Sequence, residues 1–70
     1  MLRFEFESEA VRYGNPEYTY VVRLQGKETE EDIIWALAET KEDAQEVAEA
    51  ETLAYASSSR RFYAEPKSLP

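Results

Sequence analysis

The side chains in this sequence that could do chemistry are almost all carboxylates. Asp and Glu number 15 in 70 residues, whereas histidine and cysteine are absent. Those two absent residue types supply the commonest general bases, nucleophile triads and zinc ligands, so such sites are excluded. Paired carboxylates need a pocket that separates their pKa values, and a core this small seldom forms one. We therefore expect no catalytic residue, no cofactor and no enzyme activity.

The densest acidic stretch, residues 28–32, is rich in oxygen ligands of the kind that calcium prefers. It lacks the Asp-rich positions and the central glycine of an EF-hand loop. We expect no metal site.

The negative charge is concentrated in one third of the chain. The formal net charge is −7, but residues 28–51 hold ten acidic residues and one basic residue, a net of −9, and the remainder carries +2. This balance argues against nucleic acid or an anionic membrane as a direct partner. A well-solvated surface is the simplest interpretation of such a segment.

A row of carboxylates favours a more specific interpretation. Glu42, Glu46 and Glu49 fall on one face of an expected helix, about 6 Å and then about 4.5 Å apart along its axis. Like charges at these spacings destabilise a helix, and interspersed lysines would be as soluble and more stable. We therefore expect a cationic partner. The residues expected to contact it are Glu28, Glu30, Glu31, Asp32, Glu39, Glu42, Asp43, Glu46 and Glu49.

The first third of the chain predicts two strands. Apolar and charged residues alternate over residues 2–6, which is typical of a strand with one buried face. The alternation breaks at residues 8–10, where a bulge or a strand end is expected. A turn at 14–16 precedes a second strand over 18–25, rich in aromatic and β-branched residues, and the two strands are expected to form a hairpin.

The segment 33–38 allows two interpretations. Its apolar residues fall on both parities, as in a strand covered on both faces, yet they also fit helical spacing after a cap at Thr29 and Asp32. We favour a third strand, because a better helix start follows at Thr40, with Asp43 three residues later.

The helix expected over 41–55 has acidic residues on its outer side. A short edge strand over 60–65 should end at Pro66, and 66–70 should form a loose tail. The residues of the expected buried stripe on the helix are Ala44, Val47, Ala48, Glu51, Ala54 and Tyr55.

Together these elements predict one α+β domain over residues 1–70, with the order β-β-(β)-α-β. A small antiparallel sheet of three to four strands carries one helix on one face. A double-sided apolar strand in so short a chain suggests a homodimer. Its interface is expected to contain Trp35, Tyr18 and Tyr20, since aromatic residues are favoured at interfaces. No targeting segment or apolar run of about 20 residues is visible, so a cytoplasmic protein is expected.

The largest basic surfaces in a cell are those that hold DNA, which presents one negative charge per ~1.7 Å of axis. The short length, the segment Glu28-Thr29-Glu30-Glu31-Asp32 and the acidic helix at 42–49 make this chain similar to small DNA-mimic proteins of bacteriophages. These include inhibitors of the histone-like protein HU and small anti-CRISPR proteins. The likeness covers the charged middle third, is compositional and contains no signature motif, so no residue role is transferred.

The resemblance implies a function as well as a surface. The protein would occupy the nucleic-acid-binding surface of a basic host protein, such as an HU-like nucleoid protein, and inhibit it in the host bacterial cytoplasm. Five arginines depart from this pattern and would interrupt the surface unless they face elsewhere: Arg3, Arg12, Arg23, Arg60 and Arg61. The alternative is an interaction module or inhibitor that uses a sheet edge and exposed aromatic residues.

Overall fold

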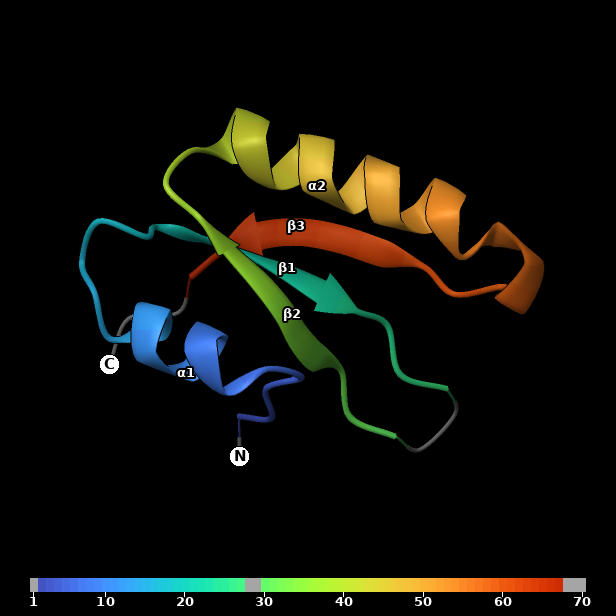
Figure 1. Cartoon of the computed structure of the whole chain (residues 1–70), viewed down its shortest axis with the longest axis horizontal. Coiled ribbons are helices and arrows are strands. Elements are labelled where there is room, and N and C mark those ends of the chain that lie inside the picture. The colour runs from blue at the N-terminus through green and yellow to red at the C-terminus, as the bar shows by residue number, and fades with distance from the viewer. Residues whose placement is uncertain (1, 28–29, 68–70) are drawn as a thin grey trace.

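The computed structural model describes residues 2–27 and 30–67. In chain order its elements are α1 (Glu7–Tyr13), β1 (Tyr20–Leu24), β2 (Ile33–Ala38), α2 (Lys41–Ala54), the 3-10 turn η1 (Ala56–Ser58) and β3 (Phe62–Pro66). The strands form one antiparallel sheet in the order β2-β1-β3, and α2 packs on one of its faces (Figure 1). The predicted α+β class, with one main helix on an antiparallel sheet, is confirmed.

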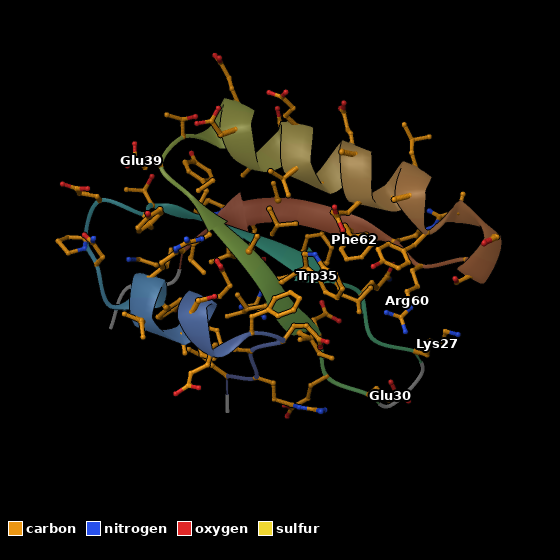
Figure 2. The ribbon with its side chains drawn as sticks, viewed as in Figure 1. Lys27, Glu30, Trp35, Glu39, Arg60 and Phe62 are labelled. Carbon is orange, nitrogen blue, oxygen red and sulfur yellow. The ribbon has the colours of Figure 1, made fainter. Side chains whose placement is uncertain are left out.

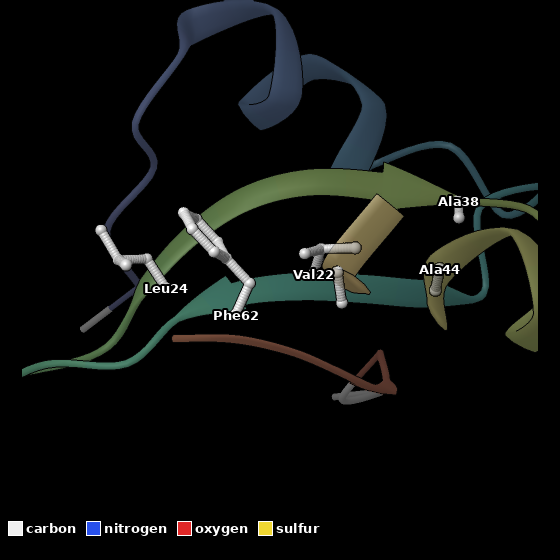
Figure 3. Close-up of a cluster of buried hydrophobic side chains, with 6 residues drawn as sticks. Val22, Leu24, Ala38, Ala44 and Phe62 are labelled. Carbon is white, nitrogen blue, oxygen red and sulfur yellow. The ribbon is translucent and has the colours of Figure 1, made fainter. Parts of the chain in front are cut away.

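The central strand β1 is buried on both faces. Val21 and Val22 point to opposite faces of the sheet and are 1% and 0% exposed. On the α2 face, small side chains let the helix approach the sheet closely, and Phe62 is the largest buried residue (Figure 3). The buried residues of this cluster are Val22, Leu24, Ala38, Ala44, Ala48 and Phe62. The opposite face holds a second cluster of Val21, Ile34 and Leu37.

The segment 33–38 is a strand, as we favoured, and its mixed parity has a physical reason. The register against β1 shifts between Val22 and Arg23, which pair with Ala36 and Ile34. Trp35 is therefore the extra residue of a β-bulge, and the bulge moves later residues of β2 to the other parity. Odd- and even-numbered residues of this segment are thus both apolar for two reasons. The bulge changes which positions face each side, and both faces of the strand are covered.

The predicted first strand is wrong. Residues 2–6 contribute only an isolated parallel bridge between Phe4 and Ile34, and the break at 8–10 lies within α1. Glu7 and Glu9 in the first turn of α1 and Arg12 in its last turn favour this helix, because they complement the helix dipole. The hairpin is formed by β1 and β2 instead.

The predicted main helix is confirmed, together with its start. The Thr40 side chain accepts a hydrogen bond of 3.1 Å from the Asp43 N–H, as an N-cap does. Its buried face is narrower than expected, since Val47 is 37% exposed and Ala54 is exposed. Both lie about 80–100° round the helix from the line through Ala44 and Ala48, beyond the width of the sheet contact.

The predicted last strand is confirmed, and it ends at Pro66 as expected. The loose tail was expected to begin there, but Lys67 is held in place. Its N–H donates to the Thr19 carbonyl over 2.8 Å, and its ammonium donates to the carbonyls of Tyr13 and Asn15 over 3.0 Å and 3.1 Å. The remaining tail residues, 68–70, lie outside the described residues.

Candidate partner-binding surface

The outer face of α2 carries the predicted acid row. Glu42, Glu46 and Glu49, hereafter the acidic ridge, are exposed and lie on the side of α2 opposite Ala44 and Ala48, which face the sheet. In Figure 2, red-tipped side chains extend from this outer side of the helix. The ridge spans about 10 Å along the helix axis.

No ion pair joins a cation to the ridge in the part of the chain that the structure describes, and Lys41, the one cation of α2, is exposed at its first residue. The two ion pairs found there join Arg12 to Glu9 and Arg23 to Glu65, both away from α2. Glu39 and Asp43 are exposed beside the start of the ridge and add to its negative charge. Five of the nine predicted contact residues therefore share one end or one face of α2: Glu39, Glu42, Asp43, Glu46 and Glu49.

The acidic loop before β2 does not continue this surface. Glu31 and Glu39 are separated by the whole of β2, about 20 Å of extended chain. Figure 2 shows Glu30 and Glu39 at opposite ends of the molecule, with Glu30 near Lys27 and Arg60. A pocket of about 470 Å³ brings Glu30 together with basic residues that include Arg60. The described part of the loop therefore carries both acidic and basic side chains. Glu28 lies outside the described residues.

Asp32 is occupied by contacts within the chain. One carboxylate oxygen accepts a 2.7 Å hydrogen bond from the Gly26 N–H, and the other accepts from the Tyr63 hydroxyl. The Gly26 N–H is the main cause that lowers the pKa of Asp32, followed by the Tyr63 hydroxyl. Burial, then the hydrogen bond to Asp32, raises the pKa of Tyr63 to about 12. Asp32 therefore links the two ends of the loop between β1 and β2 and joins them to Tyr63 of β3.

These two pKa shifts predict opposite limits of stability. Because the folded pKa of Asp32 lies below 3.8, its stabilisation is present above that pH and is lost as the pH falls through the folded value. The stabilisation from Tyr63 is present below pH 10 and is lost between pH 10 and about 12. We expect Tyr63→Phe to lower the free energy of unfolding by about 1 kcal/mol at pH 7. The variant should also lose less stability than the wild type between pH 10 and about 12, as measured by urea unfolding. The same loss of stability at alkaline pH in both proteins would contradict this role of Tyr63.

The structure directs the arginines away from the acidic ridge. Arg23 pairs with Glu65 on the sheet face opposite α2, and Arg12 pairs with Glu9 on α1. The Arg60 guanidinium lies over the Tyr55 ring, 5.7 Å from its centroid, beyond the C-terminal end of α2. Arg3 precedes the bridge to β2, and Arg61 immediately precedes β3. None of the five belongs to the outer face of α2.

Glu9 is a buried carboxylate that the sequence did not reveal. It is 6% exposed, and one of its oxygens accepts a 2.9 Å hydrogen bond from the Leu37 N–H of β2. Arg12 donates to the other oxygen over 2.9 Å. The neighbouring Ile34 exchanges backbone hydrogen bonds of 2.8 Å and 2.9 Å with the segment 3–5. The N-terminal segment therefore covers the outer edge of β2 and protects it from pairing with another strand.

We expect Glu9→Ala to lower the free energy of unfolding by about 1–3 kcal/mol, because it leaves the buried Leu37 N–H without an acceptor. Glu9→Gln keeps an acceptor and should lose less. Urea unfolding measures both, and amide hydrogen exchange at Leu37 reports the local opening. Glu7→Ala is the matched control, since Glu7 is exposed in the same turn. Equal effects at positions 7 and 9 would show that the edge contact contributes nothing.

The aromatic residues predicted for a dimer interface pack in the cores of their own chain. The Trp35 ring lies 5.0 Å from Phe62, 5.9 Å from Tyr55 and 5.4 Å from Phe6, measured between centroids. Tyr20 packs on the α2 side of the sheet and Tyr18 on the other. Both faces of β2 are covered within one chain, which removes the reason for expecting a dimer. The homodimer stays a prediction that sedimentation at increasing concentration can test.

Within residues 2–27 and 30–67, no three carboxylates gather closely enough to hold a metal ion. None of the helices in that same part of the chain is long and apolar enough to cross a membrane.

Comparison with known proteins supplies no relative: no protein-family model, curated protein or solved structure matches this chain.

Proposed function

We propose that this protein is a non-enzymatic inhibitor that binds a basic DNA-binding protein through the acidic ridge. It acts as a DNA mimic by occupying the surface that would hold nucleic acid. The observation that carries the proposal is the row of exposed carboxylates on α2, which no described cation pairs. An HU-like nucleoid protein in a bacterial cytoplasm is the kind of target that the charge pattern suits.

The spacing of the ridge supports this proposal. Its charges are separated by about 6 Å and about 4.5 Å along the axis, against ~3.4 Å per charge along one strand of duplex DNA. An array of this density can engage several lysines or arginines at once, and its field raises the rate of encounter. The acidic loop before β2 is left out of the proposed surface, because it lies at the other end of β2 among basic residues.

Competition with DNA tests the proposal. The measurement uses purified HU bound to a fluorescent DNA duplex, to which this protein is added at low salt. We expect the DNA to be released, and we expect the affinity of this protein for HU to fall steeply between ~50 mM and ~200 mM salt. A complex in which HU holds both this protein and DNA would refute mimicry for that target. The same assay on other basic DNA-binding proteins distinguishes a wrong target from a wrong mechanism.

A further inference from the structure

Within residues 2–27 and 30–67, the outward-facing backbone groups of β3 are capped or missing at both ends of its outer edge and unpaired in the middle. The Gln25 N–H donates to the Arg61 carbonyl, and the Lys67 N–H donates to the Thr19 carbonyl, so the odd-numbered residues of β3 bond to β1. The even-numbered residues therefore direct their backbone groups outward. Pro66 has no N–H to offer, which closes the end of the strand.

The other end of this edge is closed by α2. The Thr52 hydroxyl accepts a 3.1 Å hydrogen bond from the Phe62 N–H and lies 3.4 Å from the Phe62 carbonyl, to which it donates. Among the residues that the structure describes, Ala64 is thus the one of β3 whose N–H and C=O both face outward without a cap from α2 or a proline. One extended segment could pair with Ala64, as in recognition by strand addition.

A groove runs beside this open position, between α2 and β3. Its volume is about 580 Å³, and its walls include the apolar residues Leu53, Phe62 and Ala64. Leu53 is 78% exposed, so its side chain is accessible to an occupant of the groove. Glu49 of the acidic ridge lines the same groove. Apolar surface, free backbone groups and a carboxylate therefore meet in one place.

We infer that this groove binds an extended basic segment of the partner protein. The segment pairs its backbone with Ala64, packs an aliphatic side chain against Leu53, and places a lysine or arginine beside Glu49. This inference rests on the proposed function and names the element of the partner that is bound. The charge of the groove favours a basic segment over a second copy of this chain. A second copy would bring its own acidic ridge towards Glu49, whereas a basic segment neutralises the Glu49 carboxylate.

Synthetic peptides test the inference on the wild-type protein. One probe is an extended peptide in which lysine and valine alternate at every second residue with threonine between them, so that lysine and valine side chains both point to the α2 side of the sheet. The other is a helical peptide with the same number of lysines. We expect the extended peptide to bind about 10-fold more tightly at low salt, because only it can pair with Ala64. N-methylation of alternate amides should abolish that advantage on one parity of the peptide and spare it on the other, since only one parity faces β3.

Two variants test the protein side of the same contact. Ala64→Pro removes the outward N–H and leaves the bonds to β1, because a proline is tolerated where the N–H faces away from the sheet. Leu53→Ala removes the apolar wall, and Val11→Ala is its matched control, since Val11 is 74% exposed on α1. We expect Ala64→Pro and Leu53→Ala each to weaken binding of the extended peptide about 10-fold. Val11→Ala should bind as the wild type does.

The possible results separate this inference from the proposed function. In one result, HU binding is strong and salt-dependent, while neither N-methylation nor the two variants alter peptide binding. That result would overturn the inference that the groove binds an extended segment, and it would leave the proposed binding through the acidic ridge intact. If neither HU nor the basic peptides bind at low salt, both proposals fail. A concentration-dependent dimer that Ala64→Pro dissociates would overturn the inference in favour of self-association through β3.

Discussion

Replacing Glu42, Glu46 and Glu49 together by glutamine is expected to weaken binding to HU by about 10- to 100-fold at low salt. Each exposed ion pair contributes about 0.5–1 kcal/mol, and three such pairs sum to this range. The free energy of unfolding should stay constant or rise by a few tenths of a kcal/mol, because two like-charge pairs on the helix are relieved. Titration at two salt concentrations and urea unfolding measure the two effects separately.

A matched variant separates the position of the charge from its amount. Glu5, Glu7 and Glu17 are exposed residues outside α2, and their replacement by glutamine changes the net charge from −7 to −4, as the ridge variant does. We expect this control to bind nearly as tightly as the wild type. Equal losses in the two variants would mean that overall charge, and no particular surface, attracts the partner.

Trp35→Ala is expected to lower the free energy of unfolding by about 3 kcal/mol, a large part of the ~4–10 kcal/mol typical of a chain this short. Its ring contacts Phe6 of the N-terminal segment and Tyr55 and Phe62 of the α2 face, so its removal takes one ring partner from each of the three, and Tyr55 and Phe62 then keep only their contact with one another. Urea unfolding followed by circular dichroism measures the loss. We expect the loss to be independent of protein concentration, because these ring contacts join residues of one chain.

A role for Trp35 in a homodimer predicts a different result. The monomer would then keep its stability, and only self-association in sedimentation would weaken. Phe6→Ala is the useful comparison, since Phe6 is 47% exposed and shares the contact with Trp35. It should cost about 1 kcal/mol, less than Trp35→Ala, because less buried surface is lost.

Local signals were sufficient for much of the fold. The start of α2 could be predicted because the Thr40 cap acts within a few residues, and the strands β1 and β3 because their apolar patterns are strong and their ends are marked. The segment 33–38 was harder, since a bulge at Trp35 breaks the alternation that identifies a strand. The choice of a strand depended on the helix start that follows it.

The N-terminal segment could not be predicted from its pattern. Residues 2–6 alternate as a strand does, yet only Phe4 bridges to the sheet. Glu9 lies in a helix instead, where its carboxylate accepts a hydrogen bond from the Leu37 N–H of β2. That arrangement depends on which edge of β2 is left open, a property of the assembled sheet that no local pattern encodes. The burial of Glu9 and the capture of Asp32 by Gly26 and Tyr63 have the same origin, because their partners are distant in the sequence.

The dense acidic segment and the lack of histidine and cysteine are properties of the amino-acid sequence alone. The acidic ridge is such a property too, because helical periodicity places Glu42, Glu46 and Glu49 on one face wherever the helix packs. The separation of the loop before β2 from the ridge and the internal hydrogen bonds of Asp32 became visible only in the folded chain. The same holds for the groove in which Ala64 and Glu49 meet. Charge spacing along a helix is local, whereas the order of the strands in the sheet sets which edges and loops become neighbours.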